Sequence, residues 1–463
     1  MYAGLDYGTS NCSIGLWRDD RAWLVPLEDE RTLIPSTVYA PRQDLVLQSI
    51  DKTRYALADR ARLIAALRDR AERAEQTWRD QPLALRSRSS DELLFGSAAM
   101  EAHFAAPEEG FYVKSPKSFL GARGLNDEVH ERFIAIVSAM IANIRDKAQQ
   151  FAGAEVDRVV IGRPVNFQGA GGEDDNRRAV AMVERAAREA GFAQVEFLFE
   201  PMAAAMELEA RLTRERKVLV IDIGGGTTDC SFVRIGPAHR DRLDRQADVL
   251  GHTGERLGGN DYDQLLGFHA LMPALGLGTQ LKNGLPVPNV ICMDAVSIND
   301  VIAQQRFYGA ELRGRLKAYV HEAVEPVKLR RLLRLREGRM TYRFVRAAEL
   351  TKIALSEATA VSTELGFLEP QLRIEVTRQQ LQSAAERLLM HLKGLVSEVL
   401  TMGQDRPDAV YLTGGMARSV LLRATLTQAL PDIEVIDSDH FASVTEGLTL
   451  WARRLFGAAP VSR

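Results

Sequence analysis

Two short stretches with the same outline decide the fold that this sequence predicts. The first, VIDIGGGTTDCSFV at Val220–Val233, runs from an apolar segment with one Asp through three glycines to two threonines and a second Asp. The second, GLDYGTSNCSIGL at Gly4–Leu16, repeats that order, with Gly8 followed by small hydroxyl residues. Each stretch predicts a strand, a glycine turn and a returning strand. The chain therefore contains the same device twice, roughly two hundred residues apart.

Glycine turns of this kind suit phosphate. Glycine lets the backbone approach phosphate oxygens closely, and consecutive N–H groups form a concave anion site. The carboxylates of Asp6 and Asp222, at the strand ends, suit a hydrated Mg²⁺. A turn that only joins two strands is the plain alternative, and the duplication argues against it. Two other phosphate-binding schemes fail, because the chain has no Gly-Lys dipeptide for a P-loop and GLGTQL at Gly276–Leu281 does not complete the dinucleotide fingerprint.

Composition narrows the class of protein. A chain of 463 residues is too long for one core, so we expect two or three domains. A net charge of −3 gives no electrostatic reason to expect nucleic acid or an anionic membrane as partner. Cys12, Cys230 and Cys292 form no CxxC pair, which disfavours disulfides and zinc and favours small core residues in a reducing compartment. With no signal peptide and no long apolar run visible, we expect a cytoplasmic protein.

The order of predicted elements alternates between strands and helices, which indicates an α/β fold. The duplicated turn predicts two lobes of similar topology, each giving one phosphate loop to a shared cleft. The predicted strands are Tyr2–Leu5, Arg158–Ile161, Val195–Phe199, Val218–Ile223 and Ala409–Leu412. The predicted helices are Asp127–Gln150, Asn176–Ala190, Pro201–Leu212, Arg346–Ser356 and Gln379–Met402.

Two segments read as insertions. Ser49–Gln81 has apolar residues near helical spacing and predicts an amphipathic helix, which either lies on the body of the protein or offers a surface to a partner. The second, residues 275–345, contains the basic run VKLRRLLRLREGR. Its arginines could form an anion-binding face, but interleaved leucines favour a solvated helix that covers a core.

The paired turns resemble those of the superfamily that contains actin, sugar kinases and the seventy-kilodalton heat-shock chaperones of the DnaK type. The overall pattern looks most like the short YegD-type members of the chaperone branch. Seven further stretches resemble that branch in the expected order: ERTLIPSTVYAP (Glu30–Pro41), YVKSPKSFLGARG (Tyr112–Gly124), VVIGRPVNF (Val159–Phe167), FEPMAAAMEL (Phe199–Leu208), RLGGNDYDQLL (Arg256–Leu266), AAELTKIALSEA (Ala347–Ala358) and VYLTGGMARSVLL (Val410–Leu422).

This resemblance implies a two-lobed actin-like ATPase fold, built from duplicated ribonuclease H-like domains with ATP in the cleft between the lobes. Lobe I would comprise residues 1–209, with a helical insertion at about 49–94 and a helix at about 441–463 that returns to it. Lobe II would comprise residues 210–440, with the insertion at about 275–345. We expect no peptide-binding domain, so the chain would not grip peptide by the route that full-length family members use.

The resemblance also assigns site residues, with ATP or ADP and Mg²⁺ as cofactors. The implied catalytic residues are Lys117, Glu200, Thr227 and Asp229, although Asp229 could instead simply cap its turn. Asp6 and Asp222 would hold the metal through water, Pro164 would switch between nucleotide states, and Arg177 follows it on the next helix. The implied nucleotide-binding residues are Gly8, Thr9, Ser10, Asn11, Gly224, Gly225, Gly226, Gly258, Gly259, Glu349, Lys352, Ser356, Gly414, Gly415 and Arg418.

Three positions depart from the family pattern. Ile353 stands where a basic residue usually stacks on adenine, Met416 replaces a small hydroxyl residue, and Asn260 replaces an acidic one. A second reading of Glu349 and Lys352 is an ordinary surface ion pair on a helix. These departures put the affinity and selectivity for adenine in question.

The function that the resemblance implies is slow ATP hydrolysis that drives lobe closure in a chaperone-like protein. A sugar-type kinase and an actin-like filament protein of the same superfamily are the alternatives. The expected partners are nucleotide and, through the insertions, unfolded proteins or cochaperones, and the expected state is a monomer. The Ser49–Gln81 helix is the hypothetical partner surface.

Overall fold

The computed structural model describes residues 1–41, 92–120, 127–167, 172–437 and 442–457. The chain divides into two compact units. The first comprises Met1–Arg256, Glu398–Gly414 and Ile433–Arg463, and the second comprises Leu257–Ser397 and Gly415–Asp432. The boundary predicted between residues 209 and 210 falls inside the first unit, so the division into two lobes stays a prediction. The helix predicted over Ser49–Gln81 lies outside the described residues.

The first glycine turn belongs to a mixed sheet with the strand order β3-β2-β1-β8-β9. Strands β1, β2 and β3 form an antiparallel meander, and β8 and β9 extend the sheet parallel to β1. The short β4 pairs with β2. The bounds are β1 Tyr2–Tyr7, β2 Asn11–Arg18, β3 Arg21–Leu24, β4 Ile34–Pro35, β8 Arg158–Arg163 and β9 Gln194–Phe199.

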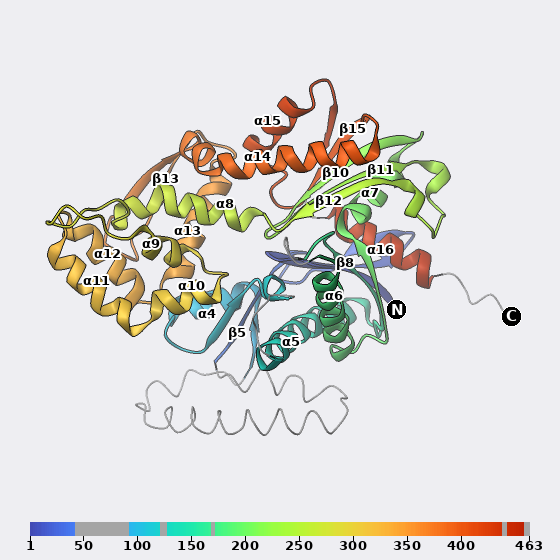
Figure 1. Ribbon diagram of the computed structural model, residues 1–463. Helices are drawn as coiled ribbons and strands as arrows, with labels where there is room; N and C mark the ends of the chain where they lie inside the picture. The colour runs from blue at the N-terminus through green and yellow to red at the C-terminus, as the bar shows by residue number, and fades with distance from the viewer. Residues whose placement is uncertain (42–91, 121–126, 168–171, 438–441, 458–463) are drawn as a thin grey trace. The chain divides into compact units, whose positions relative to one another are not determined.

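The second glycine turn belongs to a sheet with the equivalent order, β12-β11-β10-β15-β16. Here β10, β11 and β12 form the antiparallel meander, and β15 and β16 run parallel to β10 (Figure 1). The bounds are β10 Arg216–Ile223, β11 Thr228–Ile235, β12 Val249–Glu255, β15 Ala409–Thr413 and β16 Glu434–Asp437. The α/β class is confirmed, and both stretches form strand, turn and returning strand.

Helices α7 (Glu200–Arg211) and α16 (Ser443–Phe456) join the two sheets of the first unit. Helix α16 packs on β1, β2 and β8, whereas α7 packs on β10 and β11, and the two helices pack on each other. Their shared core contains Met202, Val220 and Leu448, all nearly inaccessible to solvent. Because parallel strands β1, β8, β10 and β15 are covered on both faces, they read as apolar runs, which explains why the sequence identified them.

The rest of the first unit supports the sheet around β1. Helices α5 and α6 pack on each other, and α5 also packs on β2. A three-stranded sheet of order β6-β5-β7 lies beside α4, and the short 3₁₀ helix Pro116–Phe119 follows β7. The bounds are β5 Thr37–Ala40, β6 Leu94–Phe95, α4 Gly96–Ala105, β7 Phe111–Lys114, α5 Asp127–Ala152 and α6 Gly172–Glu189.

The buried imidazole of His103 on α4 makes stability depend on pH. Its ring stacks on Tyr112 of β7 with centroids 4.4 Å apart, and burial lowers the pKa of His103 to about 4. The folded state then binds fewer protons than the unfolded chain, so stability should fall as pH drops from 6.5 towards 4. We expect a loss of up to about 3 kcal/mol from this group. Urea unfolding across this range should show a shallower pH dependence for His103→Phe, and identical profiles would contradict the prediction.

The second unit is mainly helical. Its helices pack around an apolar core that includes Leu271, Phe307, Leu332 and Phe344. The antiparallel hairpin β13–β14 contacts α13. The bounds are α8 Gly259–Leu266, α9 Asn289–Val296, α10 Val301–Tyr308, α11 Ala310–Glu322, α12 Pro326–Glu337, α13 Thr341–Ala354, β13 Ala360–Glu364, β14 Arg373–Thr377, α14 Arg378–Gly403 and α15 Val420–Ala429.

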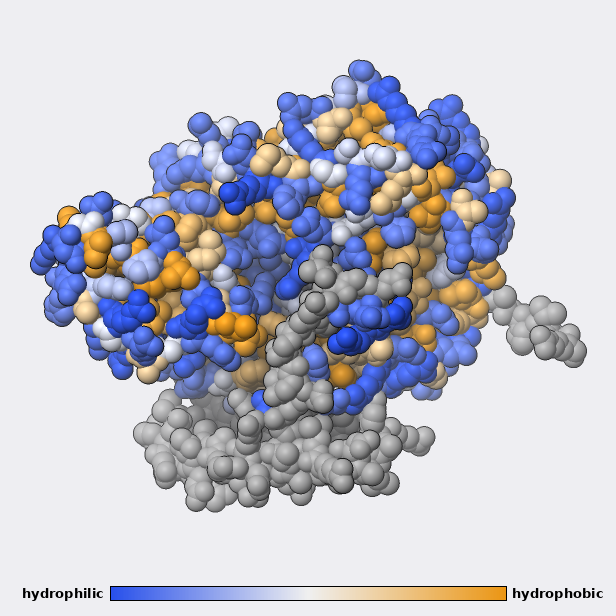
Figure 2. Space-filling model, viewed as in Figure 1, coloured by the Kyte–Doolittle hydropathy of each residue, from blue (hydrophilic) through white to orange (hydrophobic). Residues whose placement is uncertain are grey.

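The basic run on α12 contributes to the packing of the second unit. Leu329, Leu332 and Leu335 are fully buried, which agrees with a helix that covers a core. Arg336 donates to the carbonyls of Phe307 and Gly309 at the end of α10, at 2.9 and 2.7 Å. Polar and charged residues dominate the face of this unit visible in Figure 2, with apolar residues interspersed.

Within the described residues, no helix is both long enough and apolar enough to cross a bilayer.

Candidate functional site

The two glycine turns touch each other inside the first unit. Gly8–Ser10 connects β1 to β2, and residues 224–227 connect β10 to β11. A Cβ atom added at Gly225 would lie 1.9 Å from Ser10 Oγ, and one added at Gly226 would lie 2.9 Å from Thr9 Cγ2. Glycine is therefore required by the close approach of the two turns. Two turns rich in backbone N–H groups and hydroxyls consequently meet at one place.

Carboxylates gather behind these turns. Asp6 lies near the end of β1, Asp222 faces Asp229 across the β10–β11 pair, and Glu200 is the first residue of α7. Desolvation, reinforced by Glu200, raises the pKa of both Asp6 and Asp229 to about 7. Desolvation and the same neighbour raise the pKa of Asp222 well above its usual range. Burial is the main cause of these shifts and the charge of Glu200 adds to it, and one nearby amine does not offset the two together.

That amine is Lys117, on the 3₁₀ helix that follows β7. Its Nζ donates to Glu200 Oε1 at 2.7 Å, and the two side chains are only 7% and 10% exposed. Burial alone would lower the pKa of Lys117, but the charges of Glu200 and Asp6 outweigh burial and raise it. Lys117 also lowers the pKa of Asp6, Asp222 and Asp229. The ammonium is thus kept charged inside a group of four carboxyl groups.

Asp229 and Gly414 shape the edges of this group. Asp229 Oδ1 accepts a hydrogen bond from the Val165 N–H at 2.7 Å, directly after Pro164. One oxygen of Asp229 therefore accepts from the backbone that follows β8. Gly414 has φ +81°, and an added Cβ would lie 2.5 Å from Asp222 Oδ1. Asn11 begins β2, and Thr228 begins β11, so Thr227 ends its turn.

The remaining predicted residues form a separate group in the second unit. Lys352 Nζ lies 2.8 Å from Asp263 Oδ1 and donates to the carbonyl of Gly259 at 3.1 Å. A Cβ added at Gly259 would also meet Met416 at 3.3 Å. The start of α8, the last turn of α13 and the turn after β15 that contains Gly415 and Met416 therefore converge. Lys352 is buried and paired with Asp263, whereas the surface Glu–Lys pair weighed from the sequence would leave it exposed.

Other predicted residues of this group lie on α13, just beyond it, or on the turn after β15. Glu349 pairs with Arg346 at 2.8 Å, and Arg418 lies exposed on the turn after β15. Ser356 lies just beyond the end of α13 at Ala354, so it does not continue the helical face of Glu349 and Lys352. Gly258 caps α8, with its N–H bonded to Asp261 Oδ2 at 2.8 Å. Asp263 was missed from the sequence, although its place one turn after Gly259 on α8 was a usable signal.

Comparison with known proteins finds a family match for one part of the chain. Residues 126–273 match the family described as Hsp70 protein. We call these residues the Hsp70-family segment. Similar relatives are the chaperone protein DnaK of Ureaplasma urealyticum serovar 10, 31% identical over 184 residues, and that of Ureaplasma parvum serovar 3, 30% identical over 182 residues. Each alignment covers 38% of this chain and 27% of the relative, so the chain spans about a quarter of the length of these relatives.

The Hsp70-family segment holds only part of the geometry described above. It includes Glu200, Asp222, Asp229, the second glycine turn and the Gly258–Gly259 pair, all within residues 126–273. Asp6, the first glycine turn and Lys117 precede it, and Lys352 follows it. The contacts of Lys117 with Glu200, and of Lys352 with Gly259, tie residues outside the Hsp70-family segment to residues inside it.

Proposed function

We propose that this protein binds ATP with Mg²⁺ and hydrolyses it slowly, as a chaperone-like member of the Hsp70 family with a two-lobed actin-like ATPase fold. The observation that carries the proposal is the contact between two glycine turns from two sheets of equivalent strand order. The Hsp70-family segment and the DnaK relatives support it. In this proposal, residues 1–209 and 210–440 form the lobes, and nucleotide drives their closure.

The turns would hold the phosphates. Backbone N–H groups of Gly8, Gly225 and Gly226, with the hydroxyls of Thr9, Ser10 and Thr227, offer donors to phosphate oxygens. Gly224 would line the site, and its own N–H closes the turn on the Thr227 carbonyl at 3.0 Å. The Asn11 amide adds one more donor at the start of β2. A polyanion here requires cations, and Lys117 supplies one of them.

The carboxylates fit a divalent cation. Burial, with the charge of Glu200 added to it, raises the pKa values of Asp6, Asp222 and Asp229, and a bound cation would stabilise their ionised form. Asp6 and Asp222 would hold Mg²⁺ through water, because this ion keeps several of its waters. When bound, Mg²⁺ would neutralise charge on the phosphate oxygens.

The reaction is attack of water on the γ-phosphorus of ATP. The new P–O bond forms as the bond to the ADP oxygen breaks, which yields ADP, phosphate and a proton. Lys117 would donate to the γ-phosphate and orient the attacking water, and Glu200 holds the Lys117 ammonium in place through their 2.7 Å hydrogen bond. Asp229 would orient the water from the other side, with its position fixed by Val165. Catalysis of this kind is mainly positioning and charge stabilisation.

The residues that gather around Lys352 and Gly259 in the second unit are proposed to bind the adenosine part of ATP. Gly258, Gly259, Glu349, Lys352, Ser356, Gly415 and Arg418 would contact ribose and adenine, with Gly414 at the edge of the carboxylate group. Ile353 is 54% exposed next to Lys352, so an apolar side chain is available to the base in place of a cation. The proposed partners, beyond nucleotide, are unfolded proteins or cochaperones.

Substitution of Gly225 tests whether the two glycine turns bind the phosphates of ATP. Gly225→Ala should weaken ATP binding about tenfold or more, equivalent to about 1.4 kcal/mol, because the new Cβ would drive Ser10 from its place. Isothermal titration with Mg²⁺ measures the affinity. The control is Gly314→Ala on α11, where an added Cβ meets nothing within 4 Å. Equal ATP affinity in both variants and the unsubstituted protein would contradict phosphate binding by these turns.

Measurement of phosphate release and of pelleting distinguishes ATP hydrolysis from the two alternative functions, a kinase and a filament protein. Release from ATP without any added acceptor supports hydrolysis, whereas tight binding without release would favour a kinase that lacks its acceptor. Nucleotide-dependent pelleting would favour a filament.

A further inference from the structure

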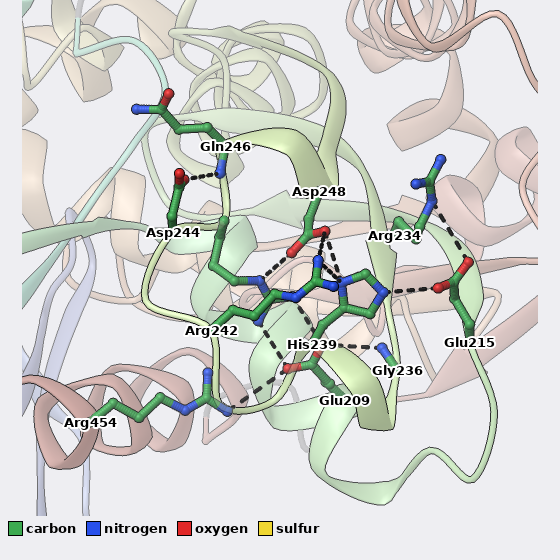
Figure 3. Close-up of polar contacts among 11 residues, drawn as sticks. Glu209, Glu215, Arg234, Gly236, His239, Arg242, Asp244, Gln246, Asp248 and Arg454 are labelled. Atoms are coloured by element: carbon green, nitrogen blue, oxygen red, sulfur yellow. Dashed lines mark hydrogen bonds and ion pairs between the residues drawn. The ribbon is translucent and has the colours of Figure 1, made fainter.

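A buried ionic cluster lies at the C-terminal end of α7, about nine residues from Glu200. We call it the Glu209 cluster, and it consists of Glu209, His239, Arg245 and Asp248. Figure 3 labels Glu209, His239 and Asp248 of this cluster. All four residues are buried, and Glu209 has no exposed surface. The last three residues come from the connection between β11 and β12. The cluster therefore fastens that connection to α7.

Glu209 receives donors from three directions. Arg245 binds it in a bidentate manner, with Nη2 2.9 Å from Oε1 and Nη1 3.0 Å from Oε2. The N–H of Gly236 donates to Oε1 at 3.1 Å. Arg454 of α16 lies 3.8 Å from Oε2. A bidentate guanidinium fixes both distance and orientation, so these contacts hold the end of α7 in one geometry.

The backbone at the end of α7 is held from the same connection. Arg240 donates through Nε and Nη2 to the carbonyl of Glu209 at 3.1 and 3.0 Å, and through Nη2 to the carbonyl of Leu212. The Glu209 carbonyl also accepts from the Leu212 N–H at 3.1 Å, so the guanidinium adds to the hydrogen bonds that close the end of the helix. The helix end and its side chain are thus fixed together.

The connection between β11 and β12, which supplies these donors, is also held by ion pairs among its own residues. Arg245 Nε donates to Asp248 Oδ2 at 2.6 Å, and His239 Nδ1 lies 2.8 Å from Asp248 Oδ1. The second ring nitrogen of His239 lies 2.9 Å from Glu215 Oε2. Arg245 is therefore bound on both sides, and it cannot follow a displaced Glu209 without breaking its contact with Asp248.

The opposite end of α7 carries Glu200, which holds Lys117. Nine residues of α-helix span about 14 Å and resist compression, so displacement at one end appears at the other. Between the two ends, Ala203, Ala204 and Ala205 are fully buried in apolar contacts. Apolar burial is non-directional. The contacts at Glu209 add directional constraints on the axial position of α7 to the close packing of α7 against α16.

We propose that Glu209 and Arg245 are positioning residues that set the axial position of α7 and thereby the contact of Glu200 with Lys117. The catalytic consequence rests on the proposed ATP hydrolysis, but the effect on the Glu200–Lys117 contact does not. A displacement of about 1 Å at a catalytic group can cost about 100-fold in rate.

Two variants and two measurements test this proposal. Arg245→Met leaves the Glu209 carboxylate buried without its main partner, and the double variant Glu209→Met with Arg245→Met removes both charges while it keeps apolar volume. Reaction of Lys117 with an amine-acylating reagent, followed by mass spectrometry, reports the Glu200–Lys117 contact. Single-turnover phosphate release reports catalysis. The matched control is Glu131→Met with Arg185→Met, which removes a bidentate pair between α5 and α6 in the same unit.

The expected result is severalfold faster acylation of Lys117 in both variants, with phosphate release reduced about 100-fold, and neither effect in the control. Unchanged acylation of Lys117 in the folded double variant would overturn the proposal, whether or not phosphate release falls. Faster acylation in a protein that never releases phosphate would uphold the positioning role while it refutes the proposed hydrolysis. If Arg245→Met does not fold, the double variant decides.

Discussion

Lys117→Ala is expected to reduce single-turnover phosphate release from ATP by about 100- to 1,000-fold, the usual effect of removing one donor that stabilises transition-state charge. The ammonium is held 2.7 Å from Glu200 and lowers the pKa of three neighbouring carboxyl groups. Without it, the site loses the cation that faces the transferred phosphoryl group. The remaining carboxylates also repel ATP more strongly, so nucleotide affinity should fall together with the rate.

Rapid-quench measurement of phosphate, with protein in excess over ATP, separates the chemical step from product release. Lys393→Ala is the matched control, because Lys393 is an exposed lysine on α14 that donates to Gln428 Oε1 at 2.9 Å. A thermal unfolding curve for each variant shows whether the buried substitution leaves the protein folded. Phosphate release at the original rate from folded Lys117→Ala would refute the assigned role of this residue.

Gly447→Ala is expected to destabilise the first unit by about 3 kcal/mol or more. Gly447 of α16 lies against α7, where an added Cβ would be 1.8 Å from the Ala203 carbonyl oxygen and 2.4 Å from its carbon. These are backbone atoms, so no rotamer change relieves the overlap. The two helices must separate, and the core around Met202 and Leu448 loses its close packing.

Urea unfolding followed by circular dichroism measures this effect as a lower midpoint. Gly394→Ala is the control, since Gly394 lies exposed in the interior of α14 with nothing within 4 Å of its added Cβ. That change should raise helix stability by about 0.8–1.0 kcal/mol, because alanine favours helix over glycine. Equal midpoints for Gly447→Ala and the unsubstituted protein would show that α7 and α16 do not pack as closely as described.

Local patterns were sufficient for the elements that carry the proposed phosphate contacts. The strands at the two glycine turns were predicted because strands covered on both faces are apolar along their length, and because glycine marks the turn that follows. Helices α5, α7 and α14 were predicted to within a few residues for the same kind of reason, since apolar periodicity and end signals lie within one segment. Boundaries were less certain, as Ser356 beyond α13 illustrates.

The sequence by itself determined the α/β class, the duplicated strand–turn–strand device and the residue types that gather at it, because each depends on neighbours within a few positions. Only the tertiary structure decided which distant groups meet. The Lys117–Glu200 hydrogen bond joins residues 83 positions apart, Lys352 is buried on Asp263, and Glu209 receives Arg245 from another connection. Apolar burial drives chain collapse without specifying partners, whereas hydrogen bonds and ion pairs require defined distances and directions. Those distances exist only once both sheets, α7 and α16 have packed together.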